Sequence, residues 1–343
     1  MTSNPDRLAR LGWNQHFADA FHELRDTNVV PARVSVEHNH LFRVYTSSAE
    51  ILASATGRLK HIADAPSALP AVGDWVSIRP TAEGPAQILA ILPRTTCFSR
   101  KAAGDATKRQ VVAANIDTVF LVSGLDGDFN SRRIQRYLVA VSDSGAKPVV
   151  VLNKSDLAEN VKAAATKLRE IATDVPIHVT SCEDGRGIDA LVRYLTVGHT
   201  IALLGSSGVG KSTLINQLLG YDRQRTQTVR PRDRRGRHTT VHRELLLHPR
   251  NGVIIDTPGM RELRLWDSSG GIETTFDDIQ ALVGSCRSRD CQHRTEPGCA
   301  VQQAVTNGKI SSGRLFYYHQ LQDERTALGK RRDELAQLKD KRR

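Results

Sequence analysis

The stretch Gly205-Ser206-Ser207-Gly208-Val209-Gly210-Lys211-Ser212-Thr213 decides the fold of the central part of this chain. It follows a short apolar run, residues 201–204, and opens a helical pattern over residues 214–219. A strand, a glycine-rich turn and a helix in this order are the context in which G-x-x-x-x-G-K-S binds phosphates. The glycines let backbone N–H groups turn inward, and the helix N-terminus adds its positive dipole. We therefore predict a phosphate-binding loop rather than a chance turn before a surface helix.

Two side chains of this loop have predicted roles beyond binding. Lys211 is expected to reach the β- and γ-phosphates of a nucleotide, which makes it a candidate catalytic residue. The Ser212 hydroxyl is expected to complete the ligand shell of a Mg²⁺ ion that accompanies the nucleotide. The remaining residues of the stretch, through Thr213, are predicted to bind the nucleotide.

A second motif, Asn153-Lys154-Ser155-Asp156, follows the apolar run 149–152. An N-K-x-D sequence at a strand end is typical of the guanine site of GTPases. The Asp156 carboxylate is expected to accept hydrogen bonds from guanine N1–H and from its exocyclic amine, whereas adenine would leave it unpaired. Asn153 is expected to brace the loop and contact N7 or O6, and the Lys154 stem to lie over the base. Alone, the motif also fits a solvated turn; beside a phosphate loop we interpret it as a guanine reader.

A weaker signal for the same site is Ser181-Cys182, which follows residues 177–180 and precedes Gly185 and Gly187. It resembles the loop that supports guanine from its other edge. An ordinary strand-to-helix turn is the alternative. We predict that Ser181 and Cys182 bind the guanine.

A third strand end carries Asp256-Thr257-Pro258-Gly259 after the apolar residues 253–255. A D-x-x-G motif supplies a carboxylate for the Mg²⁺ shell and a glycine N–H for the γ-phosphate. We therefore predict that Asp256 binds magnesium and that Asp256 and Gly259 bind the nucleotide.

Residues 221–240 separate the phosphate loop from this motif and hold seven arginines, from Arg223 to Arg237. They end in His238-Thr239-Thr240. A threonine here is expected to bind Mg²⁺ when γ-phosphate is present, which would make the segment a switch. We assign Thr239 and Thr240 to the nucleotide and Thr240 to magnesium. A disordered basic loop is the alternative, and both can hold because switch segments order in only one nucleotide state.

The pattern around these motifs alternates between strands and helices, which predicts a parallel sheet with ligands at the carboxyl ends of its strands. Predicted strands cover 118–122, 148–152, 177–180, 200–204 and 252–255. Predicted helices cover 132–141, 157–171, 187–195 and 211–219. The motif order is unusual, because the guanine motifs precede the phosphate loop. In ordinary GTPases they follow it, so the chain has a circularly permuted order, which a sheet tolerates when the original termini are close.

Residues 29–95 have a period of two instead. Strand-like runs cover 32–36, 41–46, 51–59, 74–79 and 86–92 and are separated by turn signals. Short strands in this number fit a small barrel of the OB type, which commonly binds oligonucleotides; a generic β-barrel without a ligand remains open. A helix is predicted before the barrel, as a mobile arm or a packed cap, and a polar, basic connector after it, over 95–115.

The C-terminal part holds Cys286, Cys291, His293 and Cys299 within 14 residues. Three thiols and one imidazole suit a closed tetrahedral site, so we predict one structural Zn²⁺ ion per chain. Beyond it, residues 315–338 predict a charged helix with a basic tail, which either follows phosphates or is a solvated helix face.

Charge and targeting signals narrow the class of protein further. The 343 residues carry a formal charge of +11, which predicts a polyanionic partner. The sequence has no apolar run long enough to span a membrane and no signal-peptide pattern, and its five cysteines suit a reducing compartment. We expect a cytoplasmic protein without a membrane partner.

This combination resembles the circularly permuted, ribosome small subunit-dependent GTPase A family of bacteria, over nearly the whole chain. The resemblance rests on Val72-Gly73-Asp74, the helix 132–138, Asn153–Asp156, Gly205–Thr213, Gly236–Thr240, Asp256–Gly259 and the Cys/His cluster. One departure is mild, since Ser181-Cys182 stands where the family has Ser-Ala. The resemblance implies hydrolysis of GTP to GDP, stimulated by the small ribosomal subunit, in late maturation of that subunit. It also implies rRNA contacts by the barrel and the zinc domain.

The predicted fold is thus α/β: a circularly permuted P-loop GTPase domain with an N-terminal OB-type barrel and a C-terminal helical zinc-binding domain, in a monomer. The predicted parts are an arm (1–28), the barrel (29–95), a connector (96–115), the GTPase domain (116–267) and the zinc-binding part (268–343). The competing class is a kinase or helicase-like ATPase that uses the phosphate loop for other chemistry, which the N-K-S-D motif argues against.

One catalytic role is predicted from the residue that directly follows the D-x-x-G motif. In Ras-like enzymes a glutamine after D-x-x-G orients the attacking water. Met260 stands there in this chain and has no useful donor or acceptor. His238 is our candidate for placing the water, because neutral imidazole accepts a hydrogen bond. The alternatives are that His238 only packs the closed switch or that a neighbouring arginine stabilises the transition state.

Overall fold

The computed structural model describes residues 5–38, 41–62, 68–102, 105–172, 174–222, 243–249, 251–256 and 271–340. They form two compact units. The first comprises residues 1–129, 144–159 and 176–263, and the second residues 130–143, 160–175 and 264–343. The five-part division expected from the sequence stays a prediction.

The N-terminal strands of the first unit close into a barrel. Strand β1 pairs with β2, β2 with β3, β3 with β5, β5 with β4, and β4 returns to β1. The strands are β1 (Val30–His38), β2 (Leu41–Tyr45), β3 (Glu50–Ala55), β4 (Trp75–Arg79) and β5 (Ala86–Ile91). The barrel core is apolar and includes Val34, Val44 and Ile78, all fully buried. The barrel predicted from the period of two is therefore confirmed, except that β3 ends at Ala55 and helix α3 (Gly57–Ile62) follows.

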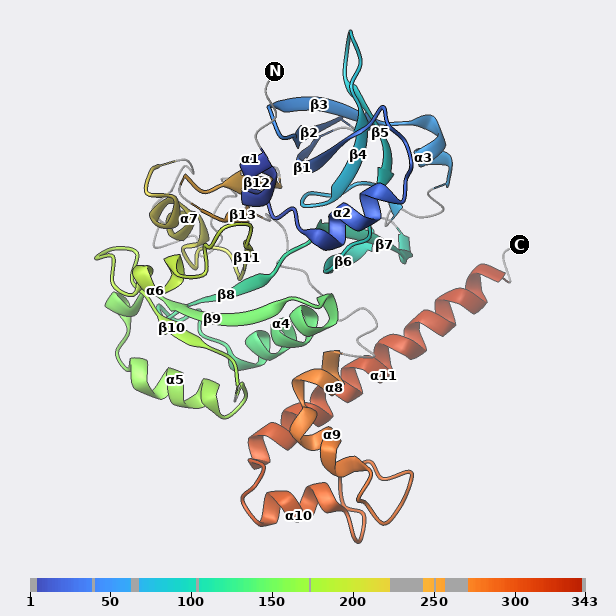
Figure 1. Cartoon of the computed structure of the whole chain (residues 1–343). Coiled ribbons are helices and arrows are strands. Elements are labelled where there is room, and N and C mark those ends of the chain that lie inside the picture. The colour runs from blue at the N-terminus through green and yellow to red at the C-terminus, as the bar shows by residue number, and fades with distance from the viewer. Residues whose placement is uncertain are drawn as a thin grey trace. The chain divides into compact units, whose positions relative to one another are not determined.

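The same hydrogen-bonded sheet continues into the part that carries the nucleotide motifs, in the order β10-β9-β8-β11-β13-β12. Its strands are β8 (Thr118–Gly124), β9 (Lys147–Asn153), β10 (Ile177–Val179), β11 (Thr200–Leu204), β12 (Glu244–Leu247) and β13 (Val253–Asp256). All neighbouring pairs here are parallel except β12 with β13. Strands β8, β9, β11 and β13 are buried along most of their length, which explains their continuous apolar runs. The carboxyl ends of β9, β10, β11 and β13 therefore share one edge of the sheet (Figure 1).

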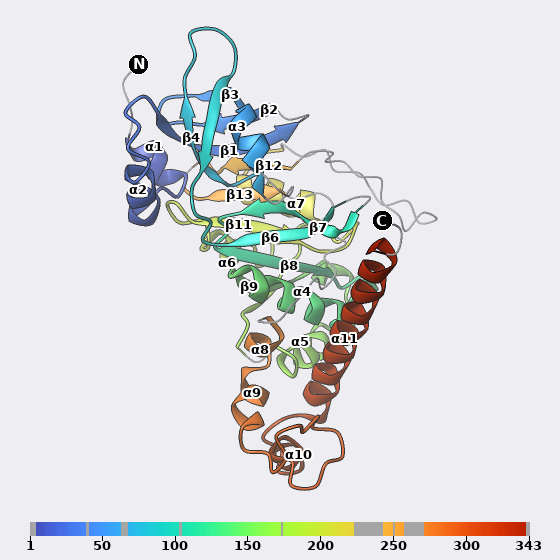
Figure 2. The ribbon, with the colours of Figure 1, turned by 90° about the vertical axis from the view of Figure 1, so that its right-hand side faces the viewer.

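Two elements of the first unit differ from the sequence expectation. Residues 97–114, expected as a connector, form an antiparallel pair of strands, β6 (Cys97–Ala102) and β7 (Asp105–Ala114), which lie side by side in Figure 2. Strand β12 was not predicted; it pairs with β13 and, through Val36 opposite Glu244, with β1. β12 thus joins the barrel to the parallel sheet.

The N-terminal helices are a packed cap, which answers the alternative left open by the sequence. They are α1 (Pro5–Arg10) and α2 (Gln15–His22), with Asn14 accepting a hydrogen bond from the Phe17 N–H as the N-cap of α2. Trp13 lies edge-on to Trp75 of β4, with ring centroids 4.8 Å apart. Leu11 is fully buried. These contacts fix the cap against the barrel.

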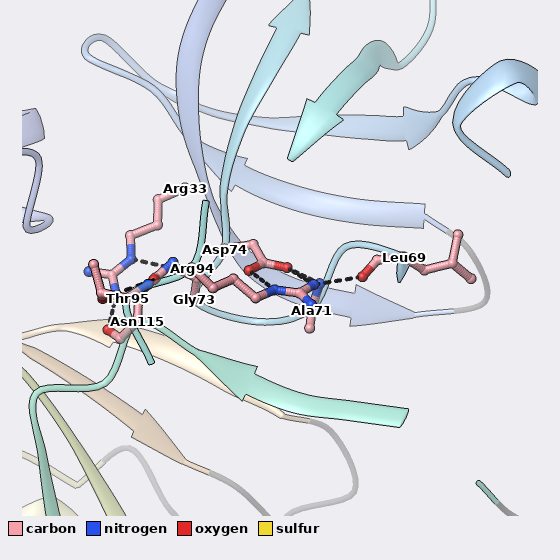
Figure 3. A network of polar contacts seen from close by, with 8 residues as sticks. All are labelled: Arg33, Leu69, Ala71, Gly73, Asp74, Arg94, Thr95 and Asn115. Carbon is pink, nitrogen blue, oxygen red and sulfur yellow. Dashed lines mark hydrogen bonds and ion pairs between the residues drawn. The ribbon is translucent and has the colours of Figure 1, made fainter. Parts of the chain in front are cut away.

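Arg33 on β1 is buried and connects the cap, the barrel and the parallel sheet. Figure 3 shows its place beside Gly73 and Asn115. Its guanidinium donates to the carbonyl of Leu11, to Gly73 O at 3.1 Å, to Asn115 O at 2.8 Å and to Thr200 Oγ1 at 3.0 Å. Burial lowers the pKa of Arg33 to about 10, so the group stays charged at neutral pH. The hydrogen bonds therefore compensate a buried charge.

The Val72-Gly73-Asp74 stretch forms the other half of this network. Gly73 has φ +92°, and a Cβ atom there would lie 2.1 Å from Ala114 O, so only glycine fits. Burial raises the pKa of Asp74, and the bidentate Arg94 guanidinium, at 2.7 Å from both carboxylate oxygens, opposes that rise. The stretch therefore has a structural role and links the barrel to residues 94–115.

The second unit is helical. Its helices are α4 (Ser131–Ser144), α5 (Val161–Arg169), α8 (Gly271–Thr275), α9 (Asp277–Val283), α10 (Ala300–Thr306) and the long α11 (Ser312–Asp340) (Figures 1 and 2). Its core packs Ile272, Phe276 and Ile279 against Val301 and Leu315, among others. Arg314 of α11 is buried, stacks over Phe276 and pairs with both carboxylate oxygens of Asp278, at 2.6 and 2.7 Å. Within the described ranges, none of the helices is both long and apolar enough to cross a membrane.

Candidate nucleotide site and metal centre

The phosphate loop connects β11 to helix α7 (Lys211–Leu219), as predicted. Gly210 has φ +93°, and a Cβ there would lie 2.4 Å from Asn153 Nδ2; a Cβ on Gly205 would lie 2.2 Å from Val122 O. Val209 is fully buried in the core of the parallel sheet and anchors the loop. The Lys211 ammonium lies within the loop and donates to Gly205 O at 2.8 Å and to Ser206 O at 2.6 Å. Ser212 and Thr213 are half-buried in the first turn of α7.

Asn153, the last residue of β9, joins three of the predicted motifs. Its Nδ2 donates to Val209 O in the phosphate loop at 2.9 Å. Its Oδ1 accepts from Thr180 Oγ1 at 3.1 Å and from the Cys182 thiol at 3.4 Å. The bracing role predicted for Asn153 is therefore visible in the side chain itself, which is buried and has contacts on both of its polar atoms.

The other residues predicted around the base lie at the same edge. Lys154 has a left-handed backbone, φ +62°, and begins a 3₁₀ turn (Ser155–Leu157) in which the Asp156 side chain is exposed. Ser181 is fully buried, and Gly187 is needed behind it because a Cβ there would lie 2.2 Å from Val179 O. Burial raises the pKa of Cys182 to about 11, so this thiol is protonated and able to donate to Asn153 at neutral pH.

Asp256 ends β13, beside the strand that leads into the phosphate loop. The two strands run parallel with Ala202 opposite Ile255, which places Asp256 at the same edge as Ser212. Asp256 is 6% exposed. The predicted residues Gly259, His238, Thr239 and Thr240 lie outside the described residues, as does Met260.

Two carboxylates of this edge were missed by the sequence reasoning. Asp126 Oδ2 lies 2.5 Å from Lys154 Nζ, and Asp128 Oδ2 accepts from the Ser206 hydroxyl at 2.7 Å. Both belong to the loop after β8, the strand between β9 and β11. The available signal was their position directly after a buried strand, in Leu125-Asp126-Gly127-Asp128.

The four predicted zinc ligands converge in the second unit. The ligand atoms of Cys286, Cys291, His293 and Cys299 all lie within 4.8 Å of one another. His293 Nδ1 is 3.5 Å from the sulfurs of Cys286 and Cys299, and these two sulfurs are 4.0 Å apart. A tetrahedral ion with Zn–S bonds of about 2.3 Å requires sulfurs ~3.8 Å apart. The donor set therefore fits a metal such as zinc.

Hydrogen bonds around the cluster act on the thiols and fix the loop. Burial raises the pKa of Cys286, but hydrogen bonds from the Ala300 and Val301 N–H groups and from Cys291 and Cys299 together outweigh it, so the net pKa is lowered. Burial raises the pKa of Cys291 to about 11. Cys299 is the N-cap of α10 and accepts from Gln302 N. Glu296 accepts from the amides of Gln292, Arg294 and Thr295 at 2.7–3.0 Å. Hydrogen bonds from its own backbone N–H and from these three lower the pKa of Glu296 to about 2.

Comparison with known proteins agrees with this geometry. Residues 91–266 match the RsgA GTPase family model. A protein of Opitutus terrae named small ribosomal subunit biogenesis GTPase RsgA is 48% identical over 95% of this chain and 92% of its own length. The crystal structure of YjeQ from Thermotoga maritima superposes with a TM-score of 0.66 at 26% identity, covering 87% of this chain and 99% of that one.

A second solved structure supports the fold alone. YloQ, described as a circularly permuted GTPase, superposes with a TM-score of 0.63 at 22% identity, covering 89% of this chain and 96% of its own. The permuted motif order, the strand order and the family match lead to one assignment. This chain belongs to the RsgA GTPase family and is a circularly permuted GTP hydrolase.

Proposed function

We propose that this GTPase acts in late maturation of the small ribosomal subunit, and that the subunit stimulates its hydrolysis of GTP to GDP and phosphate. The role in small-subunit biogenesis is supported by the name of the Opitutus terrae relative, at 48% identity. The observation that carries the nucleotide site is Asn153, whose side chain joins the guanine motif, the Thr180–Cys182 stretch and the phosphate loop.

The residue roles follow from this edge of the sheet. Asp156, exposed in its turn, reads guanine N1–H and the exocyclic amine, while Ser181 and Cys182 support the base from the other side. Lys211 and the loop amides bind the phosphates, and Thr239 and Gly259 complete this shell. Ser212, Thr240 and Asp256 would hold Mg²⁺, which neutralises phosphate charge when bound.

His238 is proposed to place the attacking water. The proposal rests on the sequence, because Met260 replaces the polar residue that follows D-x-x-G in Ras-like enzymes. Ordering of residues 221–240 on the subunit would bring His238 to the γ-phosphate and account for stimulation.

A structural zinc ion in the Cys286, Cys291, His293 and Cys299 site is proposed to stabilise the second unit, and the mutual distances of the four ligand atoms, all within 4.8 Å, support this proposal. We further propose that the barrel and the zinc loop, where Arg287 and Arg289 are exposed, bind rRNA. The formal charge of +11 supports a polyanionic partner. A monomer in the cytoplasm is the form proposed to act.

The decisive experiment measures the GTPase rate with and without purified small subunits, at several salt concentrations. Stimulation that weakens steeply as salt rises supports the proposal, because rRNA binding releases counterions. An unchanged rate with subunits contradicts it. Displacement of bound GTP by ATP as readily as by GDP would instead favour the kinase or ATPase class.

The role of His238 needs a separate measurement. Single-turnover hydrolysis of the His238→Ala variant with saturating subunits should be greatly slowed while GTP affinity is unchanged. Full stimulation of the variant would assign the water to another group.

A further inference from the structure

The loop that follows β8 lies between the two nucleotide motifs. β8 is hydrogen-bonded to β9, which ends in the guanine motif, and to β11, which leads into the phosphate loop. The loop begins with Leu125, whose N–H donates to Asn153 O at 2.9 Å. Gly127 has φ +92°, which a glycine adopts readily, and separates the two aspartates. The loop therefore presents one carboxylate toward each neighbouring motif.

The two carboxylates have different partners. Asp126 pairs with the Lys154 ammonium at 2.5 Å, and these side chains are only 29% and 21% exposed. Asp128 accepts from Ser206 Oγ at 2.7 Å, and the carbonyl of the same Ser206 accepts from Lys211. One contact thus holds the lysine of the guanine motif, and the other holds the residue that positions the lysine of the phosphate loop.

A carboxylate beside a polyphosphate site repels the phosphates, so its presence there calls for a favourable effect on binding that offsets this repulsion. We propose that Asp126 and Asp128 are positioning residues of the nucleotide site: Asp126 aligns Lys154 against the base, and Asp128 aligns the phosphate loop through Ser206. Neither residue touches the reacting atoms. Their effect is to preorganise two lysines before the nucleotide arrives, which reduces the ordering cost of binding. This inference rests on the proposed nucleotide site.

The two aspartates should have separable effects. Asp126→Ala should weaken binding of a fluorescent GDP roughly tenfold, mainly through faster dissociation, since about 1.4 kcal/mol corresponds to a factor of ten. Single-turnover hydrolysis of bound GTP should stay within twofold, because Lys154 contacts the base and not the phosphates. Asp128→Ala should lower both affinity and the single-turnover rate. Asp128→Asn should restore both, because its amide oxygen still accepts from Ser206.

Double-mutant cycles show whether each aspartate acts through its partner. In a Lys154→Met background Asp126→Ala should add less than twofold, and in a Ser206→Ala background Asp128→Ala should add less than twofold. The crossed pairs, Asp126 with Ser206 and Asp128 with Lys154, should multiply. Asp26→Asn is the matched control, because Asp26 forms an ion pair with Arg79 of the barrel.

The outcomes are distinguishable. Multiplicative effects within the matched pairs, or an Asp128→Asn variant as impaired as Asp128→Ala, overturn the inference while the control still binds GDP normally. If the wild-type protein and the control both fail to bind guanine nucleotides, the proposed site is wrong, and the inference with it. Thermal melting of each variant separates these results from simple unfolding.

Discussion

The Asn153 side chain is held by neighbouring loops on both of its polar atoms. Its amide nitrogen is used by Val209 O and its amide oxygen by Thr180 and Cys182. At Cys182, where the resemblance implies an alanine, the thiol adds a donor to this oxygen. Asp156, three residues further along the chain, has an exposed side chain. In our proposal, bracing and guanine reading are thus divided between two residues of one motif.

Guanine specificity should be lost by a single change at Asp156. In Asp156→Asn the amide cannot accept both hydrogen bonds from guanine, and we expect GTP affinity to fall at least ~100-fold, from two charge-assisted bonds. The amide can pair with the C2 carbonyl of xanthine, so xanthosine triphosphate should bind to the variant more tightly than to the wild type. Competition titrations with both nucleotides measure this. Asp189→Asn, an exposed aspartate of helix α6 (Ile188–Val192), is the control. Unchanged GTP affinity would refute the assignment.

The Ser212 hydroxyl should matter for turnover and not for folding. Ser212 is half-buried in the first turn of α7, so Ser212→Ala removes an oxygen without leaving a large cavity. Loss of a predicted Mg²⁺ ligand should reduce turnover on the order of 100-fold. Turnover is measured across a magnesium titration, beside circular dichroism and melting. A variant that folds normally and turns over normally would remove Ser212 from the catalytic machinery.

At the scale of elements, the barrel strands and the parallel strands were predictable, whereas β12 and the β6–β7 pair were not. β8, β9 and β11 are buried on both faces, so their sequences are almost wholly apolar. β12 has only four residues, and its position between β13 and β1 depends on pairing with both strands, which no local pattern encodes. β7 begins with polar residues and reaches its apolar residues, Val111 to Ala114, only at its end, so it resembled a connector. The contacts of Asp126 and Asp128 required the strand order, because their partners are 28 and 78 residues away in sequence.

The zinc loop gives a prediction at this scale. Glu296 lies between the ligands His293 and Cys299 and accepts hydrogen bonds from three backbone N–H groups. Glu296→Gln should therefore loosen the loop and weaken zinc binding about tenfold, as changes around metal ligands commonly do. Cys291→Ser should lose the metal altogether. Chelator competition on protein purified without added zinc measures both. Glu324→Gln on helix α11 is an exposed control. Metal-free wild-type protein would rule the site out, and equal zinc retention in Glu296→Gln and the control would dismiss the role of Glu296.

A low-pH effect follows from the same residue. The pKa of Glu296 is about 2 in the folded protein, below its ordinary value of 4.5. A depressed folded-state pKa contributes stability above the unfolded-state value, and this contribution is lost as pH falls from about 4.5 toward 2. Unfolding of the metal-free protein should therefore depend on pH in this window more in the wild type than in Glu296→Gln. Parallel pH profiles would contradict this.

At the scale of the whole molecule, the barrel is part of the nucleotide unit and not an appended module. β1 belongs to the barrel and pairs with β12, and Arg33 on β1 reaches Thr200 at the start of the strand that leads to the phosphate loop. Period and turn signals predicted the barrel and the parallel sheet separately. Their junction could not be predicted, because a single arginine in a strand normally indicates a solvated face, and only the assembled fold shows the four acceptors around it.

Arg33 should therefore stabilise the first unit as a whole. Arg33→Met keeps the length of the side chain but leaves the carbonyls of Leu11, Gly73 and Asn115 without this donor, which should cost about 3 kcal/mol or more. Arg33→Lys should restore stability only partly, because one ammonium cannot span the acceptors that the planar guanidinium reaches.

Arg79→Met is the control, since Arg79 is 45% exposed in its ion pair with Asp26 and its replacement should cost about 0.5 kcal/mol of stability. Urea unfolding measures all three in a Trp266→Phe background, followed by the fluorescence of Trp13 in the cap and Trp75 in the barrel and by release of bound GDP from the sheet. In the wild type the two signals should change together, and in Arg33→Met the barrel signal should change at lower urea than GDP release. An Arg33→Met protein as stable as Arg79→Met, with coincident signals, would show that the β1–β12 pairing alone joins the barrel to the sheet.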